Sequence, residues 1–233
     1  MQRHAFLVLE GHPYGRRMLQ RLREAGLAPA LVIAERSTVA EKERAKFEAR
    51  MAGLPAPPSM QELSGDLELV TVGDHNEPRC LELLRQAGVD WVLLGGTRIL
   101  KGALLELDML NVHPGLLPWV RGSSAEAWSI MKDHPVGVTC HRVDSGVDTG
   151  PILLRRLLEL APAESYEHIV WRNMGLAAQT MVEALQLLQS GEARFLPQQL
   201  EEGHSYRVMG PARLEEVRRR LASEAYSPRA VSL

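Results

Sequence analysis

Short apolar runs alternate with helix-type repeats along the first part of the chain. The runs at 5–9, 30–34, 67–72 and 91–94 each end at glycine or at a charged residue, which predicts buried strands. Between them, apolar residues recur at helical spacing, around Met18 before Gly26 and after Pro78 before Gly88. This alternation of strand, helix and strand predicts a mostly parallel sheet flanked by helices.

The rest of the chain extends this pattern. A charged helix is expected within 35–50, followed by a proline-rich loop at 54–58. Further strands are expected at 109–112, 137–143 and 152–154, the last two as a pair. Further helices are expected from a capping box at Ser123–Glu126 to Met131, over about 164–189, and at 214–221. We therefore expect a Rossmann-like α/β domain with a mostly parallel twisted sheet over residues 1–200, and a short, partly helical C-terminal extension over 201–233.

Charge and cysteine content narrow the classes of function. The 233 residues include 27 lysines and arginines against 29 aspartates and glutamates, a net charge of −2. A nucleic-acid-binding domain usually has a surplus of basic residues, so no nucleic-acid partner is expected. Cys80 and Cys140 are spaced neither like a metal site nor like a redox pair, which fits a reducing cytoplasm. The apolar run broken by Glu10 is too short for a signal sequence or a membrane span, so we expect a cytoplasmic protein without a membrane partner.

Three motifs carry candidate chemistry. Gly11–Gly15 follows the first strand but lacks the G-x-G-x-x-G spacing of a dinucleotide site, so a tight turn is favoured. Asn111 and His113 would share one side of a strand end and could polarise a carbonyl there, although a turn-forming asparagine and a structural histidine are the commoner interpretation. Asp148 lies in an Asp- and Gly-rich loop that does not match a calcium loop. It either caps a turn or supplies a carboxylate to His113.

A metal site is the remaining interpretation of these residues. It would be built from His113, Cys140, His141 and Asp148. Cys140 and His141 are neighbours on one strand and face opposite ways, which removes one of them, and the others have no compact ligand spacing. No metal is expected.

Two blocks of sequence together resemble a known family. They read N-V-H-P-G-L-L-P-W-V-R-G at 111–122 and G-V-T-C-H-R-V-D-S-G-V-D-T-G-P-I-L-L at 137–154. They resemble the 10-formyltetrahydrofolate-dependent formyltransferases, whose pattern is Asn-x-His-Pro-Ser-Leu-Leu-Pro and then Gly-Val-Thr-x-His with Asp-x-Gly-x-Asp-x-Gly. Gly115 stands where the family usually has Ser, and the likeness extends in element order over most of 1–190. The resemblance implies that Asn111, His113 and Asp148 are the catalytic residues.

The resemblance also implies a folate pocket made of two segments. The first follows the strand at 91–94 and contains Gly95, Gly96, Arg98, Ile99 and Leu100. The second is the Asp-rich loop with Val143, Asp144, Gly146 and Val147. The pterin would lie against both segments, largely through backbone groups.

The reaction implied is transfer of a formyl group from 10-formyltetrahydrofolate to an amine. Asn111 would donate to the formyl oxygen as negative charge develops on it. His113 would donate to the same oxygen or to the leaving folate nitrogen. Asp148 would raise the proton affinity of the imidazole and help to remove the amine's proton.

The expected acceptor is a primary amine or hydroxylamine on a small molecule or a carrier. A methionyl-tRNA formyltransferase normally has a further C-terminal domain, and a formyltetrahydrofolate hydrolase an extra N-terminal domain, and neither is expected here. Gly11–Gly15 replaces the phosphate loop of glycinamide ribonucleotide formyltransferase, although Arg16 and Arg17 could meet another phosphate. Two alternatives stay open: a hydrolase that passes the formyl group to water, and a non-catalytic folate-binding relative. The sequence leaves the oligomeric state undecided.

Overall fold

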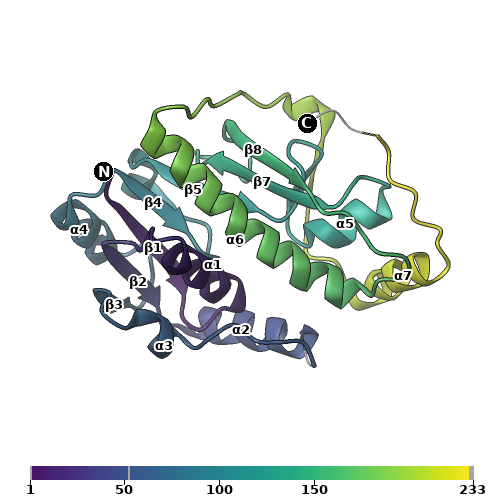
Figure 1. Ribbon diagram of the computed structural model, residues 1–233, viewed down its shortest axis with the longest axis horizontal. Helices are drawn as coiled ribbons and strands as arrows, with labels where there is room; N and C mark the ends of the chain where they lie inside the picture. The colour runs from purple at the N-terminus through teal and green to yellow at the C-terminus, as the bar shows by residue number, and fades with distance from the viewer. Residues whose placement is uncertain (1, 52, 231–233) are drawn as a thin grey trace. The chain divides into compact units, whose positions relative to one another are not determined.

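The protein divides into two compact units. The computed structural model describes residues 2–51 and 53–230, and its elements are labelled in Figure 1. Unit 1 comprises Met1–Asn111 and Met181–Ala193, and unit 2 comprises Val112–Thr180 and Arg194–Leu233.

Unit 1 is built on a parallel sheet. Its strands are β1 (His4–Leu9), β2 (Leu31–Glu35), β3 (Leu69–Val72), β4 (Trp91–Leu94) and the first residues of β5 (Met109–His113). They lie in the order β3-β2-β1-β4-β5, and every neighbouring pair is parallel. β1, β2 and β4 are buried along their whole length, as expected of strands covered on both faces. The predicted mostly parallel sheet is confirmed.

Helices connect these strands. They are α1 (Pro13–Glu24), α2 (Thr38–Arg50), α3 (Met60–Ser64) and α4 (Pro78–Ala87), with a 3-10 helix η1 (Gly102–Glu106) before β5. The chain steps from β1 to β2 in one direction across the sheet and from β3 to β4 in the other, so right-handed crossovers place α1 and α4 on opposite faces. The order therefore reverses between β1 and β4. At such a switch point, the carboxyl ends of the strands leave room for a ligand.

Unit 2 holds the end of β5 and an antiparallel hairpin. β7 (Gly137–Arg142) pairs with β8 (Ile152–Leu157), and the strand order in this unit is β5-β7-β8. A second, two-stranded sheet is formed by β6 (Val120–Gly122) and β9 (His204–Tyr206). The helices are α5 (Ala125–Met131), α6 (Tyr166–Ser190), η2 (Leu200–Glu202) and α7 (Pro211–Ala222), of which α6 supplies residues to both units.

Some local predictions need correction. The capping box at Ser123–Glu126 is wrong: α5 starts after Ser124, which has a φ of 56° and makes no side-chain cap, and Glu126 is buried. A true capping box lies at Ser59 and Glu62, at the start of the unpredicted helix α3. The strands β6 and β9 were also not predicted. The domain boundary at residue 200 stays a prediction.

In the described part of the chain, none of the helices combines the length and the apolar character that a bilayer span requires.

Candidate functional site

His113 is the last residue of β5, and its imidazole is held at both ring nitrogens. Nε2 lies 2.8 Å from the carbonyl oxygen of Val120, and Nδ1 lies 3.3 Å from Oδ2 of Asp148. The side chain is only 3% exposed. Because a carbonyl oxygen can only accept, Nε2 carries a proton and donates to Val120. The structure thus brings together two of the three residues that the family resemblance implied as catalytic.

Asp148 reaches His113 from the loop between β7 and β8. Its φ of 54° lies in the left-handed region, which Asp tolerates better than most residues. Its Oδ2 accepts the main-chain N–H of Gly122 at 2.9 Å, and its own carbonyl oxygen accepts from Nε2 of Gln198 at 3.1 Å. The carboxylate is therefore held by a backbone donor, and the loop behind it by Gln198.

Hydrogen bonds accepted by Asp144 stabilise the same loop. Oδ1 of Asp144 accepts the N–H of Gly146 at 3.0 Å and the hydroxyl of Thr149 at 2.6 Å. This is the turn-capping role of an Asp side chain. The neighbouring Val147 is 45% exposed. Asp144 therefore shapes the loop, and contacts of Val143, Asp144, Gly146 and Val147 with a pterin stay a prediction.

A second imidazole faces the carboxylate of Asp148. Nε2 of the buried His141 lies 3.6 Å from Oδ1 of Asp148, while its Nδ1 lies 3.0 Å from the carbonyl oxygen of Arg142. His141 thus repeats the arrangement of His113: one ring nitrogen on a backbone carbonyl and the other toward one oxygen of Asp148. Asp148 lies between the two imidazoles.

These contacts set the charges of the pair. Burial lowers the pKa of His113 below its ordinary value of 6.5, although the carboxylate of Asp148 acts in the opposite direction. Burial raises the pKa of Asp148, but the facing imidazoles and the N–H of Gly122 outweigh it, so the net shift is downward. At neutral pH the pair is therefore a neutral imidazole beside an ionised carboxylate.

The turn after His113 is fixed by side chains from unit 2. The hydroxyl of Thr139 donates to the carbonyl oxygen of Gly115 at 2.8 Å and accepts the N–H of Leu117 at 3.0 Å. Nδ2 of Asn173, on α6, lies 3.3 Å from the carbonyl oxygen of Pro114. A Cβ at Gly115 would lie 2.9 Å from Nε2 of His113, so this position has no room for a side chain while the ring keeps its bond to Val120.

Asn111 belongs to unit 1. It lies two residues before His113 on β5 and is in register with Leu94 of β4. Residues two apart on a strand lie on the same face. A shared role for Asn111 and the His113–Asp148 pair stays a prediction.

The segment 95–100 follows β4 at the switch point of unit 1. The N–H of Gly95 donates to Leu7 at 2.8 Å, and the carbonyl oxygen of Gly96 accepts from Leu9 at 3.0 Å. A Cβ at Gly95 would lie 2.0 Å from the ring of Phe6, so only glycine fits there. Farther along, Leu100 is buried and Ile99 is 65% exposed. This segment leaves the sheet at the place where α/β proteins bind ligands, and its contact with a folate stays a prediction.

Arg98 is paired with two carboxylates, and its contact with a folate stays a prediction. Its guanidinium makes a bidentate pair with the buried Glu35 at the end of β2 and lies 2.6 Å from Oδ2 of Asp74. Glu35 also accepts from the hydroxyl of Ser37 at 2.6 Å and from the N–H of His75 at 3.1 Å. Glu35, the acidic residue that a dinucleotide site would need, is thus committed to Arg98, which strengthens the sequence argument against such a site.

Several contacts around His113 and Asp148 could not be predicted from the sequence. Val120 and Gly122 act through backbone atoms, for which side-chain patterns give no signal. The sequence suggests His141 only as a metal ligand. Thr139 and His141 are, however, two apart on β7 and therefore share the face that meets the His113 turn and Asp148. Within residues 2–51 and 53–230, His, Cys, Asp and Glu side chains form no group of three or more that could hold a metal ion.

Comparison with known proteins shows which family the chain belongs to. The chain is 30% identical over 145 residues to the methionyl-tRNA formyltransferase of Agathobacter rectalis, an alignment that covers 60% of this chain and 47% of that protein. The chain spans about half the length of the curated relatives it matches.

Solved structures share the fold. Glycinamide ribonucleotide transformylase 1 from Symbiobacterium toebii superposes with a TM-score of 0.63 at 23% identity, covering 84% of this chain and 94% of that one. A formyltransferase from Anoxybacillus kamchatkensis, solved with UDP-4,6-dideoxy-4-formamido-L-AltNAc and tetrahydrofolate, gives a TM-score of 0.56 at 20% identity and covers 88% of this chain and 85% of that one. The formyl transferase family model matches residues 2–185, so the chain belongs to the formyl transferase family.

Proposed function

We propose that this protein transfers a formyl group from 10-formyltetrahydrofolate to the primary amine or hydroxylamine of a small-molecule or carrier-bound acceptor. The observation that carries the proposal is the pair formed by the buried His113 and the half-buried Asp148, in which Nδ1 and Oδ2 lie 3.3 Å apart, in a chain that matches the formyl transferase family. The Anoxybacillus relative, solved with tetrahydrofolate and a formamido sugar nucleotide, supports a folate donor and an amine acceptor.

The geometry suits the pair to receive a proton. Nε2 of His113 donates to Val120, so in the neutral ring the lone pair of Nδ1 points at the carboxylate of Asp148. A proton taken up between these two atoms replaces that repulsion with an ion-paired hydrogen bond. The pair is therefore proposed as the general base.

Formyl transfer forms one bond, breaks another and moves one proton. The lone pair of the acceptor nitrogen forms a bond to the formyl carbon, and the bond from that carbon to the folate nitrogen breaks. The proton lost by the acceptor passes to the His113–Asp148 pair, directly or through water, and is returned to the folate nitrogen. Asn111 is proposed to donate its amide N–H to the formyl oxygen while that oxygen carries negative charge.

His113 is less suited to the role of oxyanion donor that the sequence analysis also allowed. In the neutral form its only N–H is on Nε2, and this N–H donates to the carbonyl oxygen of Val120. Donation to a formyl oxygen would require this bond to break first. We therefore assign charge stabilisation to Asn111 and proton transfer to the pair.

The test is conversion of 10-formyltetrahydrofolate, followed by absorbance, with acceptors supplied one class at a time. The classes are amino-sugar nucleotides, hydroxylated ornithine, carrier-bound amino acids, glycinamide ribonucleotide and methionyl-tRNA. The last is included because methionyl-tRNA formyltransferases are among the relatives, so a response to it would overturn the prediction of no nucleic-acid partner. Conversion without any acceptor would identify a hydrolase. Binding without conversion would identify a non-catalytic relative.

A further inference from the structure

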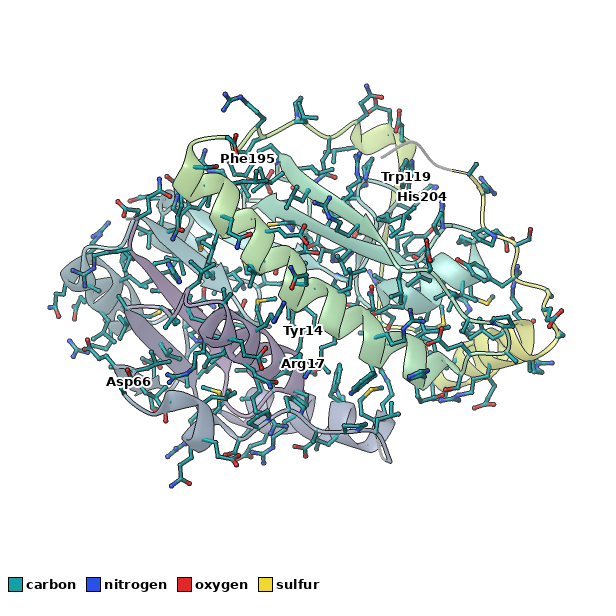
Figure 2. The ribbon with its side chains drawn as sticks, viewed as in Figure 1. Tyr14, Arg17, Asp66, Trp119, Phe195 and His204 are labelled. Atoms are coloured by element: carbon teal, nitrogen blue, oxygen red, sulfur yellow. The ribbon has the colours of Figure 1, made fainter. Side chains whose placement is uncertain are left out.

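The strand β6 uses its two backbone edges for different purposes. On one edge, the carbonyl oxygen of Trp119 accepts the N–H of His204 at 3.2 Å, and the N–H of Ser123 donates to Tyr206 at 3.0 Å. Figure 2 labels Trp119 and His204 at this junction. The paired groups belong to alternate residues of the chain, as in an ordinary strand ladder. This edge is covered by β9, from the C-terminal part of the chain.

The other edge of β6 holds the proposed catalytic pair. The carbonyl oxygen of Val120 accepts from Nε2 of His113 at 2.8 Å, and the N–H of Gly122 donates to Oδ2 of Asp148 at 2.9 Å. Val120 and Gly122 lie between Trp119 and Ser123, the residues whose backbone groups are hydrogen-bonded to β9. One three-residue strand therefore joins the C-terminal segment to both His113 and Asp148.

The fit between β9 and β6 is tight. A Cβ at Gly122, whose φ is +85°, would lie 2.3 Å from the carbonyl oxygen of Tyr206. A Cβ at Gly203 would lie 1.8 Å from the carbonyl oxygen of Pro118. Both glycines are sites where one backbone approaches another too closely for a side chain. A displacement of β9 would therefore directly displace the backbone of β6.

Side chains also tie the C-terminal segment to the region around β6. Nη1 of Arg121 donates to the carbonyl oxygen of Leu200 at 3.0 Å. The indole N–H of Trp128 donates to Arg207 at 2.9 Å, and its ring stacks on Tyr206 with centroids 4.6 Å apart. The N–H of Met209 donates to the hydroxyl oxygen of Ser124 at 3.1 Å. The segment 200–209 is thus anchored along its whole length.

We propose that the segment 200–209 is a positioning element of the His113–Asp148 pair, acting through the backbone of β6. The proposal rests on the proposed function in so far as it takes this pair as the catalytic one. It gives the C-terminal part of the chain a role for which the sequence offered no reason: β9 fixes the carbonyl of Val120 and the N–H of Gly122, and these fix the two side chains.

A pair of single-methyl substitutions tests this. Gly203→Ala adds a Cβ against Pro118, which must push β9 away from β6. Gly210→Ala is the matched control, because a Cβ there meets no atom within 4 Å and its φ of −73° suits alanine. Both variants are made in the full chain. Three properties are measured: exchange protection of the His204 amide, titration of the Asp148 carboxyl by carbon NMR, and the rate of formyl transfer.

The expected result is specific to Gly203→Ala. The His204 amide loses protection, and the pKa of Asp148 rises because the N–H of Gly122, which lowers it, moves away. The rate of transfer falls about 10- to 100-fold, the cost of a misplacement of about 1 Å. Gly210→Ala leaves all three as in the parent chain. A role in folding alone would change the thermal midpoint without moving the titration of Asp148.

Two outcomes would overturn the proposal. One is a Gly203→Ala variant in which the His204 amide exchanges freely while Asp148 titrates as in the parent. If the His204 amide stays protected in Gly203→Ala, the test passes to Gly122→Ala, because its Cβ meets the carbonyl oxygen of Tyr206 directly. The other outcome that would overturn the proposal is an unchanged titration of Asp148 in Gly122→Ala. The titrations do not depend on activity. If the parent chain transfers no formyl group, the proposed function fails, and the coupling between β9 and Asp148 is still decided.

Discussion

Nδ1 of His113 lies 3.3 Å from Oδ2 of Asp148, and the opposite ring nitrogen donates to a backbone carbonyl. A neutral histidine has one N–H, and here it is used on the side away from the carboxylate. The space between Nδ1 and Oδ2 is therefore a place for one proton. Uptake of a proton at this position is the basis of the mechanism that we propose, and it leads to the first two predictions.

Replacing Asp148 with Asn should nearly abolish transfer. The amide oxygen can still accept the N–H of Gly122, so the loop keeps its anchor, but the carboxylate that accepts the proton with His113 is lost. We expect the turnover rate to fall about 100- to 10,000-fold, the usual range for a general base. Asp66→Asn, on a carboxylate that is 85% exposed, is the control and should have little effect. A variant at Asp148 with near-normal turnover would remove this residue from the mechanism.

The pH dependence of the rate should follow His113. Burial, which outweighs the carboxylate of Asp148, lowers its pKa below 6.5, so the ring is neutral at pH 7 and gains a proton only on the acid side of 6.5. We expect transfer to fall as the pH drops through the pKa of His113, on the acid side of 6.5, with the His113 ring titrating in step by NMR. Because the folded state binds this proton less readily than the unfolded state, His113 also lowers stability as the pH falls below 6.5. A ring that titrates above 6.5 would contradict this.

Gly115 should not tolerate the serine that its family usually has there. A Cβ would lie 2.9 Å from Nε2 of His113 and 3.0 Å from the carbonyl oxygen of Val120, so the ring must leave that carbonyl. We expect Gly115→Ser to lose about 1–3 kcal/mol of unfolding free energy, as overpacked sites do, and to slow transfer. Gly175→Ser, where a Cβ meets no atom within 4 Å, is the control. Urea unfolding and the His113 Nε2–H signal measure both effects, and an unmoved signal would show that the turn adapts.

His12 should weaken unit 1 in acid. Burial is the main cause that lowers its pKa from 6.5 to about 4, and its Nδ1 accepts the N–H of Tyr14 as the N-cap of α1. Between pH 6.5 and 4 the unfolded chain binds this proton and the folded chain does not, so stability falls with pH by about 3 kcal/mol in total. Asparagine is also a good N-cap, so His12→Asn should flatten that part of the stability profile. An unchanged profile would place the acid sensitivity elsewhere.

Arg98 should matter for stability. Arg98→Met would leave Glu35 buried without its cation, a change that costs about 3–5 kcal/mol in typical buried pairs. The double variant Arg98→Met with Glu35→Gln should recover much of this loss, because it removes the unpaired charge. Denaturant unfolding of the single and double variants measures the recovery. If the single variant keeps its stability and instead binds folate poorly, Arg98 is a ligand residue.

The sequence predicted the elements whose signals are local. β1, β2 and β4 each contain a continuous apolar run, and α4 has Pro78 at its start and Gly88 in the left-handed conformation at its end. The two sequence blocks that carry the family resemblance contain His113 and Asp148, which the structure brings together. These features depend on residue type and spacing, which can be read without tertiary structure.

What could not be predicted depends on backbone groups and distant pairing. β6 and β9 are three residues each, too short for an alternating pattern, and lie more than eighty residues apart in the chain. The role of Gly122 is carried by its N–H, which every residue except proline has. The capping box at Ser123–Glu126 failed because the N–H of Ser123, which such a box pairs with the glutamate side chain, donates to the carbonyl oxygen of Tyr206 instead, a tertiary contact that overrides the local motif.

The mass of the acceptor after incubation with 10-formyltetrahydrofolate shows whether this chain passes a formyl group to an amine. We expect a formylated acceptor from one of the tested classes, formed in equal amount to the tetrahydrofolate released and dependent on Asp148. Release of tetrahydrofolate at the same rate with and without every acceptor, or no release and no folate binding, would contradict it.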